Sequence, residues 1–391
     1  MDKIRVIHII TKLELGGAQE NTIFTVSHLN RDLFHPALWS GPGGILTQEV
    51  SEKLGEDFQL IPALAREISP GRDILALFQI YRMLLKEKKQ NPDSPIIVHT
   101  HSSKAGILGR WASFWAGIPL VIHSFHGFGF NDFQPFYLRW FFINLERLTA
   151  RFTDSFIFVS RANMAKALKL KIGINKSWHL IRSGVEIEKF RPQSIDREKK
   201  KKDLGIGEGK LVTMVSCLKP QKNPLDFARS ARLVLEKVPD AWFIVCGDGE
   251  LRAELEKLVQ ELGIKERFKI LGWRRDIPEI LWASDLLVLT SLWEGLPRVY
   301  PQAMASELAI VGTRVDGAPE AVINGETGYL VPPKDYQGLA EKIIELLTNE
   351  EKRKQFGKKG ASLVKEFDIW KMVKDQEELY LKLLREKGLW N

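Results

Sequence analysis

Short runs of β-branched and aromatic residues alternate with amphipathic helical patterns along almost the whole chain. The predicted strands of the first half are IRVIHII, HPALWS, FQLIP, PIIVHTH, PLVIHSFH and SFIFVS, and those of the second half are KLVTMVSCL, AWFIVCG, RFKILGW, DLLVLTS, AIVGTRV and GYLVP. This alternation is typical of βαβ units, in which helices cover both faces of a parallel sheet. Each set suffices for its own sheet, so the sequence predicts an α/β protein with two doubly wound, Rossmann-like domains.

The length of the chain, 391 residues, agrees with two domains, because single hydrophobic cores stop growing near roughly 250 to 300 residues. Apolar periodicity lapses over residues 182–191, between the two sets of strands. We therefore expect an N-terminal domain over residues 1–184, a C-terminal domain over residues 185–368 and a helical segment over residues 369–391. Ligands bind beyond the carboxyl ends of the strands in such sheets, so we expect the functional site where the two carboxyl edges face each other.

The net charge of +8 is concentrated in the first domain. Residues 1–184 contain 22 Lys and Arg against 15 Asp and Glu, whereas residues 185–391 contain 35 against 34. This excess indicates either an anionic partner of the first domain, such as a membrane surface, or a surplus that only favours solubility. The lysine-rich run REKKKKD, residues 197–203, lacks interleaved aromatic residues and therefore predicts a solvated helix start, not a nucleic-acid-binding arm.

The sequence favours a cytoplasmic protein. Its first residues, MDKIRVIHII, predict a strand and lack the apolar core of a signal peptide. No uninterrupted apolar stretch approaches the roughly 18 residues that a membrane-spanning helix needs. The only cysteines are Cys217 and Cys246, so we expect no disulfide framework.

Two loops of the first domain contain candidate ligand-binding residues. Gly16 and Gly17 separate the first strand from a helix, where backbone N–H groups favour a diphosphate; ordinary turn geometry is the alternative. His126 lies at the end of a strand, where its ring reaches a substrate or hydrogen-bonds only to the backbone. The histidine pairs in HTH and HSFH lack a cysteine or carboxylate at ligand spacing, so we expect no metal site.

Two loops of the second domain are also candidates. Lys219 and Lys222 lie between a strand and a helix, where a flexible cation suits phosphate neutralisation, although a single loop lysine is more often simply exposed. The other loop, LWEGLPRVYPQAMASEL, contains Glu294 in a tight corner, and Gln302 follows about one and a half turns into the next helix. A helix-capping role for Glu294 is the alternative.

Together these segments resemble the large retaining glycosyltransferase family 4, or glycosyl transferases group 1, whose members have the GT-B fold. The resemblance covers nearly the whole chain, in order, through GGAQE, HSSKAGILGR, HSFHGFGF, FVS, RSGVEIEKFRP, LKPQKNPLDF, CGDGELR, LGWRRDIPEIL, SLWEGLPRVYPQAMA and VDGAPEAVINGETGYLVPP. It implies two domains facing across a cleft, with the helix of residues 369–391 packing back toward the N-terminal domain. It also implies sugar transfer from a nucleotide diphosphate sugar to a glycan or lipid-linked acceptor in cell-surface polysaccharide or glycolipid synthesis.

The resemblance further implies roles for single residues. His126 holds the donor sugar, Glu294 orients its hydroxyl groups, and Lys222 stabilises charge on the β-phosphate. The other implied donor-binding residues are Gly16, Gly17, Cys217, Gly272, Trp273, Arg274, Gly295, Leu296, Pro297 and Gln302. The implied reaction is a same-face substitution with retention, and because no Asp-x-Asp occurs, we expect neither a metal nor a cofactor besides the donor.

Two positions depart from the family pattern. Gln302 stands where the family has a second glutamate that accepts hydrogen bonds from the ribose, and an amide preserves one acceptor without the charge. Cys217 stands where an arginine commonly binds the diphosphate with two hydrogen bonds, so Lys222 has to neutralise more of the diphosphate charge. A nucleotide-sugar-binding protein with weakened catalysis is therefore one alternative. An epimerase of the same architecture, which fold analogy alone does not exclude, is the other.

The acceptor is expected on the first domain. Its segment QPFYLRWFFINLERLTARF, residues 134–152, combines aromatic residues with three arginines and suits contact with an anionic membrane at the cytosolic leaflet. We expect at least half of its apolar residues to lie in the core, because they are too many for one exposed face.

Overall fold

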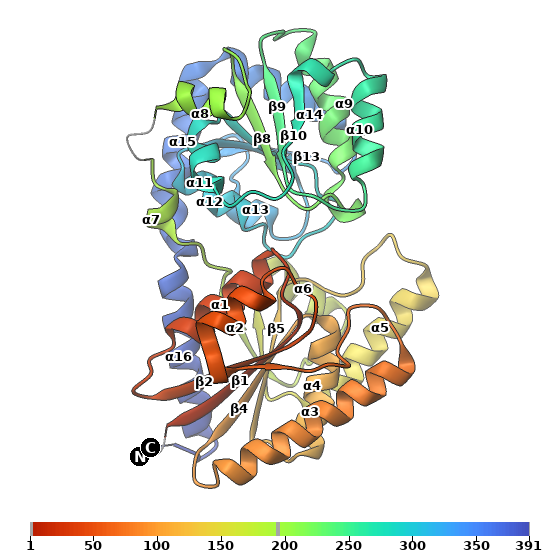
Figure 1. Cartoon of the computed structure of the whole chain (residues 1–391), viewed down its shortest axis with the longest axis vertical. Coiled ribbons are helices and arrows are strands. Elements are labelled where there is room, and N and C mark those ends of the chain that lie inside the picture. Colours follow the sequence, from red (N-terminus) through yellow and green to blue (C-terminus); the bar gives the residue numbers. More distant parts are fainter. Residues whose placement is uncertain (1–2, 193–195, 391) are drawn as a thin grey trace. The chain divides into compact units, whose positions relative to one another are not determined.

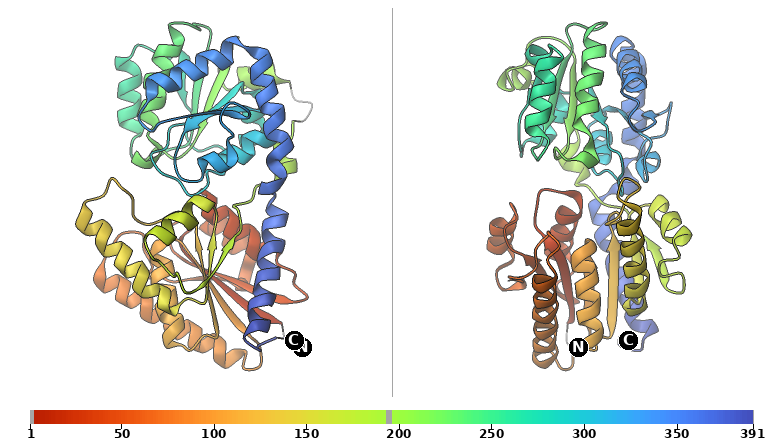
Figure 2. Two further views of the ribbon diagram at one scale, coloured as in Figure 1. Left: turned by 180° about the vertical axis from the view of Figure 1, so that it is seen from behind. Right: turned by 90° about the vertical axis from the view of Figure 1, so that its right-hand side faces the viewer.

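The computed structural model describes residues 3–192 and 196–390, and these form two compact units (Figure 1). The first unit comprises the described residues up to Gly184 together with those from Ile369 onward, and the second comprises Val185–Asp368. Each unit has one parallel sheet with helices on both faces (Figure 2), so the predicted class of two doubly wound α/β domains is confirmed.

Seven parallel strands form the sheet of the first unit, in the order β3-β2-β1-β4-β5-β6-β7. Their bounds are Ile4–Lys12 (β1), Phe34–Gly41 (β2), Phe58–Leu60 (β3), Ile96–His101 (β4), Leu120–Phe125 (β5), Ser155–Phe158 (β6) and Ser177–Leu180 (β7). The order reverses between β1 and β4, so the carboxyl ends of these two strands mark the point where doubly wound sheets bind ligands.

The helices of the first unit are Gly17–His28 (α1), Thr47–Leu54 (α2), Pro70–Gln90 (α3), Ser103–Trp115 (α4), Phe136–Thr149 (α5), Arg161–Lys169 (α6) and Ile369–Glu386 (α16). Helix α16 joins this unit although the whole second unit precedes it in the chain. Its apolar stripe, which includes Leu379, Leu383 and Leu384, shares a core with Ile4 of β1 and Ile97 of β4. The amphipathic period of α16 therefore covers one face of the first sheet.

Six parallel strands form the second sheet, in the order β10-β9-β8-β11-β12-β13. They are Leu211–Val215 (β8), Trp242–Cys246 (β9), Phe268–Ile270 (β10), Leu286–Leu289 (β11), Ala309–Thr313 (β12) and Gly328–Val331 (β13). Its helices are Ile187–Phe190 (α7), Arg197–Asp203 (α8), Pro224–Leu235 (α9), Arg252–Glu261 (α10), Ile277–Ala283 (α11), Val299–Ala305 (α12), Ala318–Ala321 (α13), Tyr336–Thr348 (α14) and Glu350–Leu363 (α15). The order reverses between β8 and β11, which places the loops after these strands side by side.

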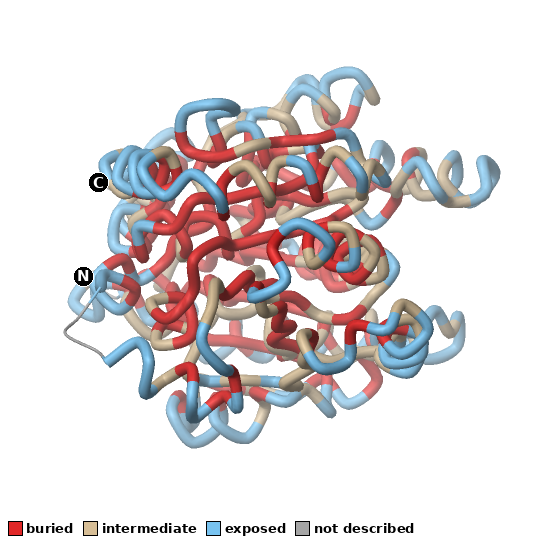
Figure 3. The backbone as a smooth tube through the Cα atoms, turned by 90° about the horizontal axis from the view of Figure 1, so that it is seen from above, coloured by how far each residue is buried: buried red, intermediate tan, exposed pale blue. Residues whose placement is uncertain are grey.

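The central strands are buried along their length. Figure 3 shows that the buried backbone, in red, lies in the interior and the exposed backbone, in pale blue, around it. Near-continuous apolar runs such as β11 form because helices cover both sheet faces. Strand β7 was not predicted, because its residues, SWHL, are polar in part and only half-buried at the sheet edge. Among residues 3–192 and 196–390, no helix has the length and apolarity to span a membrane.

Candidate active site

Lys222 and Glu294 form an ion pair in the second unit, although 72 residues separate them. Strands β8 and β11 are neighbours, so the loops that follow them meet at one edge of the sheet. Ser291 Oγ donates to the same Glu294 Oε1 at 2.6 Å. The side chains of Lys222 and Glu294 are only 18% and 7% exposed, so water screens their attraction weakly. The structure thus joins two of the residues that the sequence singled out.

Backbone and side-chain hydrogen bonds hold the two loops in place. Leu292 N–H donates to Gln221 O at 2.7 Å, and Gln221 Nε2 donates to Trp293 O at 2.9 Å. The backbone N–H of Glu294 donates to Asp316 Oδ2 at 2.7 Å, after β12. These bonds fix the backbone that leads into Glu294, so its carboxylate is held before any ligand binds.

The corner after Glu294 is buried. All four residues Glu294–Pro297 are shielded from solvent, which includes the predicted positions Gly295, Leu296 and Pro297. Helix α12 begins at Val299, not near Pro297, so half-buried Gln302 lies one turn into the helix. The α12 register therefore places Gln302 closer to the helix start than the sequence predicted.

The remaining predicted residues of the second unit lie after β8 and β10. Cys217 is a half-buried free thiol, and Gly272 has φ +68°, a left-handed conformation that favours glycine. Trp273 is 43% exposed. Arg274 donates from Nε and Nη2 to the two oxygens of Asp276, at 2.8 and 2.6 Å. Burial opposes ionisation of Asp276, but the Arg274 hydrogen bonds hold the pKa of this carboxyl well below its usual value. The guanidinium of Arg274 is thus committed to a structural ion pair.

In the first unit, Gly16 and Gly17 begin α1 after β1. Gly16 is the N-cap with an extended backbone, and a Cβ there would lie 2.8 Å from Gln19 Oε1. His126 is half-buried in the loop after β5, and its Nε2 lies 3.0 Å from Nδ1 of His101. Both predicted features therefore lie at the carboxyl edge of the first sheet.

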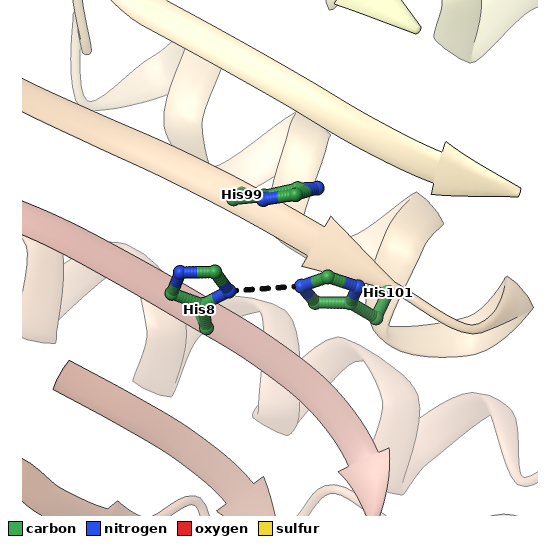
Figure 4. Close-up of side chains that lie close together, drawn as sticks. All are labelled: His8, His99 and His101. Atoms are coloured by element: carbon green, nitrogen blue, oxygen red, sulfur yellow. Dashed lines mark hydrogen bonds between the residues drawn. The ribbon is translucent and has the colours of Figure 1, made fainter. Parts of the chain in front are cut away.

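Three buried histidines gather behind His126, and the sequence analysis did not identify them as a group. His8 and His99 are direct partners in the pairing of β1 and β4, and His101 lies two residues further on the same face of β4. Figure 4 shows the three rings close together. The centroid of His99 lies 5.0 Å from that of His8 and 4.2 Å from that of His101. The strand register, which the sequence does not give, was the missing signal.

A small, partly open pocket of about 20 Å³ lies beside this cluster. Its lining includes His101, His126, Asn21 and Thr25 of α1, and Gln376 of α16. Asn21 is 2% exposed, and neither polar atom of its amide has a hydrogen-bond partner among the described residues. A space of this size, with several polar side chains in its lining, accommodates about one water molecule.

Helix α5 differs most from its predicted environment. Phe136 is 84% exposed and Trp140 66% exposed, and Tyr137 and Phe141 on the same side are also exposed. Within the helix, Ile143 is the one apolar residue that is buried. The expectation that at least half of the apolar residues would lie in the core was therefore wrong, because the helix turns its aromatic side to solvent.

The fold defines the class of protein. A structure of the Anabaena protein HepE in complex with UDP-glucose superimposes with a TM-score of 0.82 at 22% identity, covering 97% of this chain and 100% of that chain. A sucrose-phosphate synthase from Thermosynechococcus elongatus gives a TM-score of 0.82 at 19% identity, covering 98% and 100%. This likeness shows the two-domain GT-B fold of glycosyltransferases.

Sequence comparison defines the family. The model for Glycosyl transferases group 1 matches residues 196–363, and the model for Glycosyltransferase Family 4 matches residues 27–189. An Escherichia coli UDP-Gal:alpha-D-GlcNAc-diphosphoundecaprenol alpha-1,3-galactosyltransferase is 33% identical over 98% of both chains. A Campylobacter jejuni N,N'-diacetylbacillosaminyl-diphospho-undecaprenol alpha-1,3-N-acetylgalactosaminyltransferase is 29% identical, over 69% of this chain and 73% of that protein.

The chain belongs to glycosyltransferase family 4. It is a retaining glycosyltransferase of polysaccharide synthesis, and its co-substrate is a nucleotide sugar. The family thus favours transfer over the epimerisation that the sequence left open.

Proposed function

We propose that the enzyme transfers a hexosyl residue, galactose in the first instance, from a UDP-sugar to a saccharide carried on a polyprenyl diphosphate. The observation that carries this proposal is the 33% identity over 98% of both chains with the Escherichia coli enzyme, whose name specifies UDP-Gal and a diphosphoundecaprenol-linked acceptor. The name of the Campylobacter jejuni relative also specifies a diphospho-undecaprenol-linked acceptor, with a different sugar. The acceptor class therefore has support from two relatives.

In the proposed reaction, an acceptor hydroxyl attacks the anomeric carbon on the face from which the leaving phosphate departs. The new C–O bond forms as the bond from that carbon to the β-phosphate oxygen breaks, and the electron pair of the broken bond stays on the phosphate. The phosphate takes the proton of the attacking hydroxyl. Lys222 is the cation that stabilises the charge that grows on this phosphate.

The ion pair between Lys222 and Glu294 supports these roles. A lysine paired with a carboxylate is held charged and oriented before the donor binds, so little reorganisation is needed when charge develops. The second oxygen of Glu294 is available to accept from a sugar hydroxyl, while Ser291 and Lys222 occupy Oε1. We assign Glu294 to the donor sugar hydroxyls on this basis.

The other donor contacts are assigned by the family pattern. Gln302 accepts from the ribose, Gly272 and Trp273 contact the base, and Gly17 offers a backbone N–H to the diphosphate. Because Arg274 is engaged with Asp276, it acts through its backbone. Cys217 makes no charge-assisted contact with the diphosphate, so Lys222 supplies more of the neutralisation. The proposed reaction requires no metal.

Turnover tests this function. The purified enzyme is incubated with UDP-galactose, UDP-glucose or UDP-N-acetylgalactosamine and a synthetic GlcNAc-diphospho-polyprenol of short chain, and released UDP and the glycolipid product are measured. We expect release with UDP-galactose and an α-linked product. Binding of UDP-sugars without release from any of them would instead identify a nucleotide-sugar-binding protein with lost catalysis.

Lys222→Ala supplies the matched test of the site. The loss of one positioned charge donor is expected to lower kcat by about 10² to 10³-fold. Lys219→Ala, which removes a lysine from the same loop, is the control and is expected to lower kcat much less. Equal losses for both variants would contradict the special role of Lys222.

We further propose that the enzyme docks on an anionic membrane surface through α5. The exposed side of this helix places Phe136, Tyr137, Trp140 and Phe141 at helical spacing, and aromatic rings suit the membrane interface. Residues 1–184 carry the excess of Lys and Arg, which complements anionic lipid. Docking on the membrane surface brings the enzyme to a lipid-linked acceptor.

Vesicle co-sedimentation tests the docking. Binding to vesicles that contain phosphatidylglycerol is expected to exceed binding to phosphatidylcholine vesicles, and the double variant Phe136→Glu, Trp140→Glu is expected to abolish it while activity on a water-soluble acceptor persists. Trp370→Glu, at another exposed aromatic residue of the same unit, is the control. Vesicle binding that is unchanged in the double variant would rule out α5 as the docking surface.

A further inference from the structure

A chain of hydrogen bonds runs from the interior of the first sheet to His126. His8 Nδ1 lies 3.0 Å from His101 Nε2, and His101 Nδ1 lies 3.0 Å from His126 Nε2. Figure 4 marks the first of these bonds. His8 is fully buried and His101 is 3% exposed. The buried rings of His8 and His101 therefore hold His126, which the proposed function assigns to the donor sugar.

A second set of bonds fixes the neighbouring ring of His99. Its Nε2 lies 2.7 Å from Ser124 Oγ, and its Nδ1 lies 2.6 Å from Tyr380 Oη of α16. Tyr380 Oη in turn donates to Gln376 Oε1 at 3.3 Å. The ring of His99 packs 4.2 Å from that of His101, centroid to centroid, so it also limits how His101 can turn.

The rings of His8 and His101 are neutral, so the hydrogen bonds that link His8, His101 and His126 have two possible directions. Burial lowers the pKa of His8 to about 3, and burial, followed by neighbouring histidines, lowers the pKa of His101 well below its usual value. A neutral imidazole has one N–H and one bare nitrogen, so each ring donates at one end and accepts at the other. Either His8 donates to His101 and His101 to His126, or both bonds run the opposite way.

The two ends of this series of hydrogen bonds decide its direction. His8 Nε2 at the inner end and His126 Nδ1 at the outer end are both buried atoms with no hydrogen bond among the described residues. If the bonds ran inward, His8 Nε2 would carry an N–H in a fully buried ring that no ligand reaches, which is rare in folded proteins and costly. If they run outward, His8 Nε2 is bare, and the N–H at the other end lies on Nδ1 of His126, a half-buried ring that lines the pocket, where a ligand supplies the acceptor.

We propose that His101, backed by His8, is a positioning residue for His126. It donates from Nδ1 to His126 Nε2 and thereby places the proton of His126 on Nδ1, where it donates to an oxygen of the donor sugar. The proposal rests on the assignment of His126 in the proposed function. It goes beyond that assignment because it specifies the tautomer of His126 and the two buried residues that impose it.

A metal ion is the competing occupant of this cluster. One nitrogen from each of His8, His99 and His101 lies within 4.8 Å of the others. Five of the six ring nitrogens of these residues already take part in hydrogen bonds, and His8 Nε2 is the sixth. A metal bound by one nitrogen of each residue would break a hydrogen bond of His99 and a hydrogen bond of His101, so the series of hydrogen bonds is the better explanation.

Two substitutions of His101 separate an effect on the position of His126 from an effect on the stability of the protein. In His101→Asn the amide nitrogen takes roughly the place of Nδ1 and still donates to His126, whereas His101→Phe cannot donate. We expect His101→Phe to lower kcat by about 10²-fold with a smaller change in KM for the donor, and His101→Asn to recover most of the loss. His123→Asn is the control. His123 is buried on β5 and hydrogen-bonded to Thr100 Oγ1 at 2.9 Å, and it takes no part in the hydrogen bonds that link His8, His101 and His126.

Nuclear magnetic resonance of enzyme labelled with ¹⁵N in histidine reads the tautomer directly. The His126 signal is assigned by its loss in His126→Asn, and we expect Nδ1 to be protonated in the wild type and both tautomers to be present in His101→Phe. Protonation at Nε2, or an unchanged kcat in His101→Phe, would overturn the proposal. So would a stoichiometric metal in the purified enzyme that is lost in His8→Asn.

His126→Ala distinguishes this proposal from the function on which it rests. If His126→Ala keeps full kcat, the assignment of His126 to the donor sugar is wrong. If it is inactive while His101→Phe is fully active, the assignment stands and the positioning role fails.

Discussion

Mild acid is expected to unfold the first unit selectively. Its buried histidines His8, His99, His101 and His123 have pKa values lowered by burial, that of His8 from 6.5 to about 3. All eight histidines of the chain precede residue 185, so the second unit has none. Because the unfolded chain binds protons at these sites below pH 6.5 and the folded chain does not, stability falls as the pH falls below 6.5.

The magnitude follows from the number of sites. A histidine that stays neutral in the folded state contributes about 1.4 kcal/mol per pH unit below 6.5, so His8, with its pKa lowered to about 3, contributes about 2 kcal/mol at pH 5. His99, His101 and His123 add to this loss in the same direction. A typical domain has about 5 to 15 kcal/mol in total. Ordinary carboxyl groups titrate near pH 4, so they contribute little between pH 7 and 5.

Hydrogen–deuterium exchange with mass spectrometry checks this prediction unit by unit. After correction for the intrinsic pH dependence of exchange, peptides of the first unit should lose protection between pH 7 and 5, and those of the second should keep it. His8→Asn should reduce the slope of stability against pH by about 1.4 kcal/mol per unit. Equal loss in both units, or none in the first, would refute the reasoning.

The remaining predictions concern single side chains. Glu294→Gln should lower kcat/KM for the UDP-sugar by about 10- to 100-fold, since it removes a charge-assisted bond, and steady-state kinetics that match the wild type would contradict this. Gln302→Glu should tighten UDP binding in calorimetry more than it changes kcat, and the opposite order would count against the ribose contact. Leu384→Ala should destabilise by about 2 to 5 kcal/mol in hydrogen exchange of the first unit alone. In Gly312→Ala the new Cβ would meet Tyr300 Oη, so this variant should lower hydrogen-exchange protection in the second unit only. A loss of protection in both units, for Leu384→Ala or for Gly312→Ala, would show that the units do not unfold separately.

The sequence predicted the fold because its strongest signal is local. Runs such as DLLVLTS, followed by helical segments, identify buried parallel strands without knowledge of their neighbours. Strand β7 was missed because Ser177–Leu180 lies at the sheet edge and needs no continuous apolar run. Helix α5 was placed too deeply because its exposed aromatic side has the composition of a core helix.

The sequence predicted less about the functional sites than about the fold. Lys222 and Glu294 were each recognisable from their loops, but their ion pair depends on the adjacency of β8 and β11. The histidine cluster depends on the register that pairs His8 with His99, and a shift of one residue would turn these rings to opposite faces. Non-local pairing therefore accounts for what the sequence could not supply.

The contact of Tyr380 with His99 has a consequence for how the chain is made. The 184 residues of the second unit, Val185–Asp368, leave the ribosome before α16 does, which takes roughly 10 to 40 s at ordinary rates of synthesis. During this interval the apolar face of the first sheet that α16 covers stays open to chaperones, and His99 lacks its tyrosine partner. A chain whose synthesis stops within the second unit therefore cannot complete its first domain, and quality control can remove it as an unfinished product.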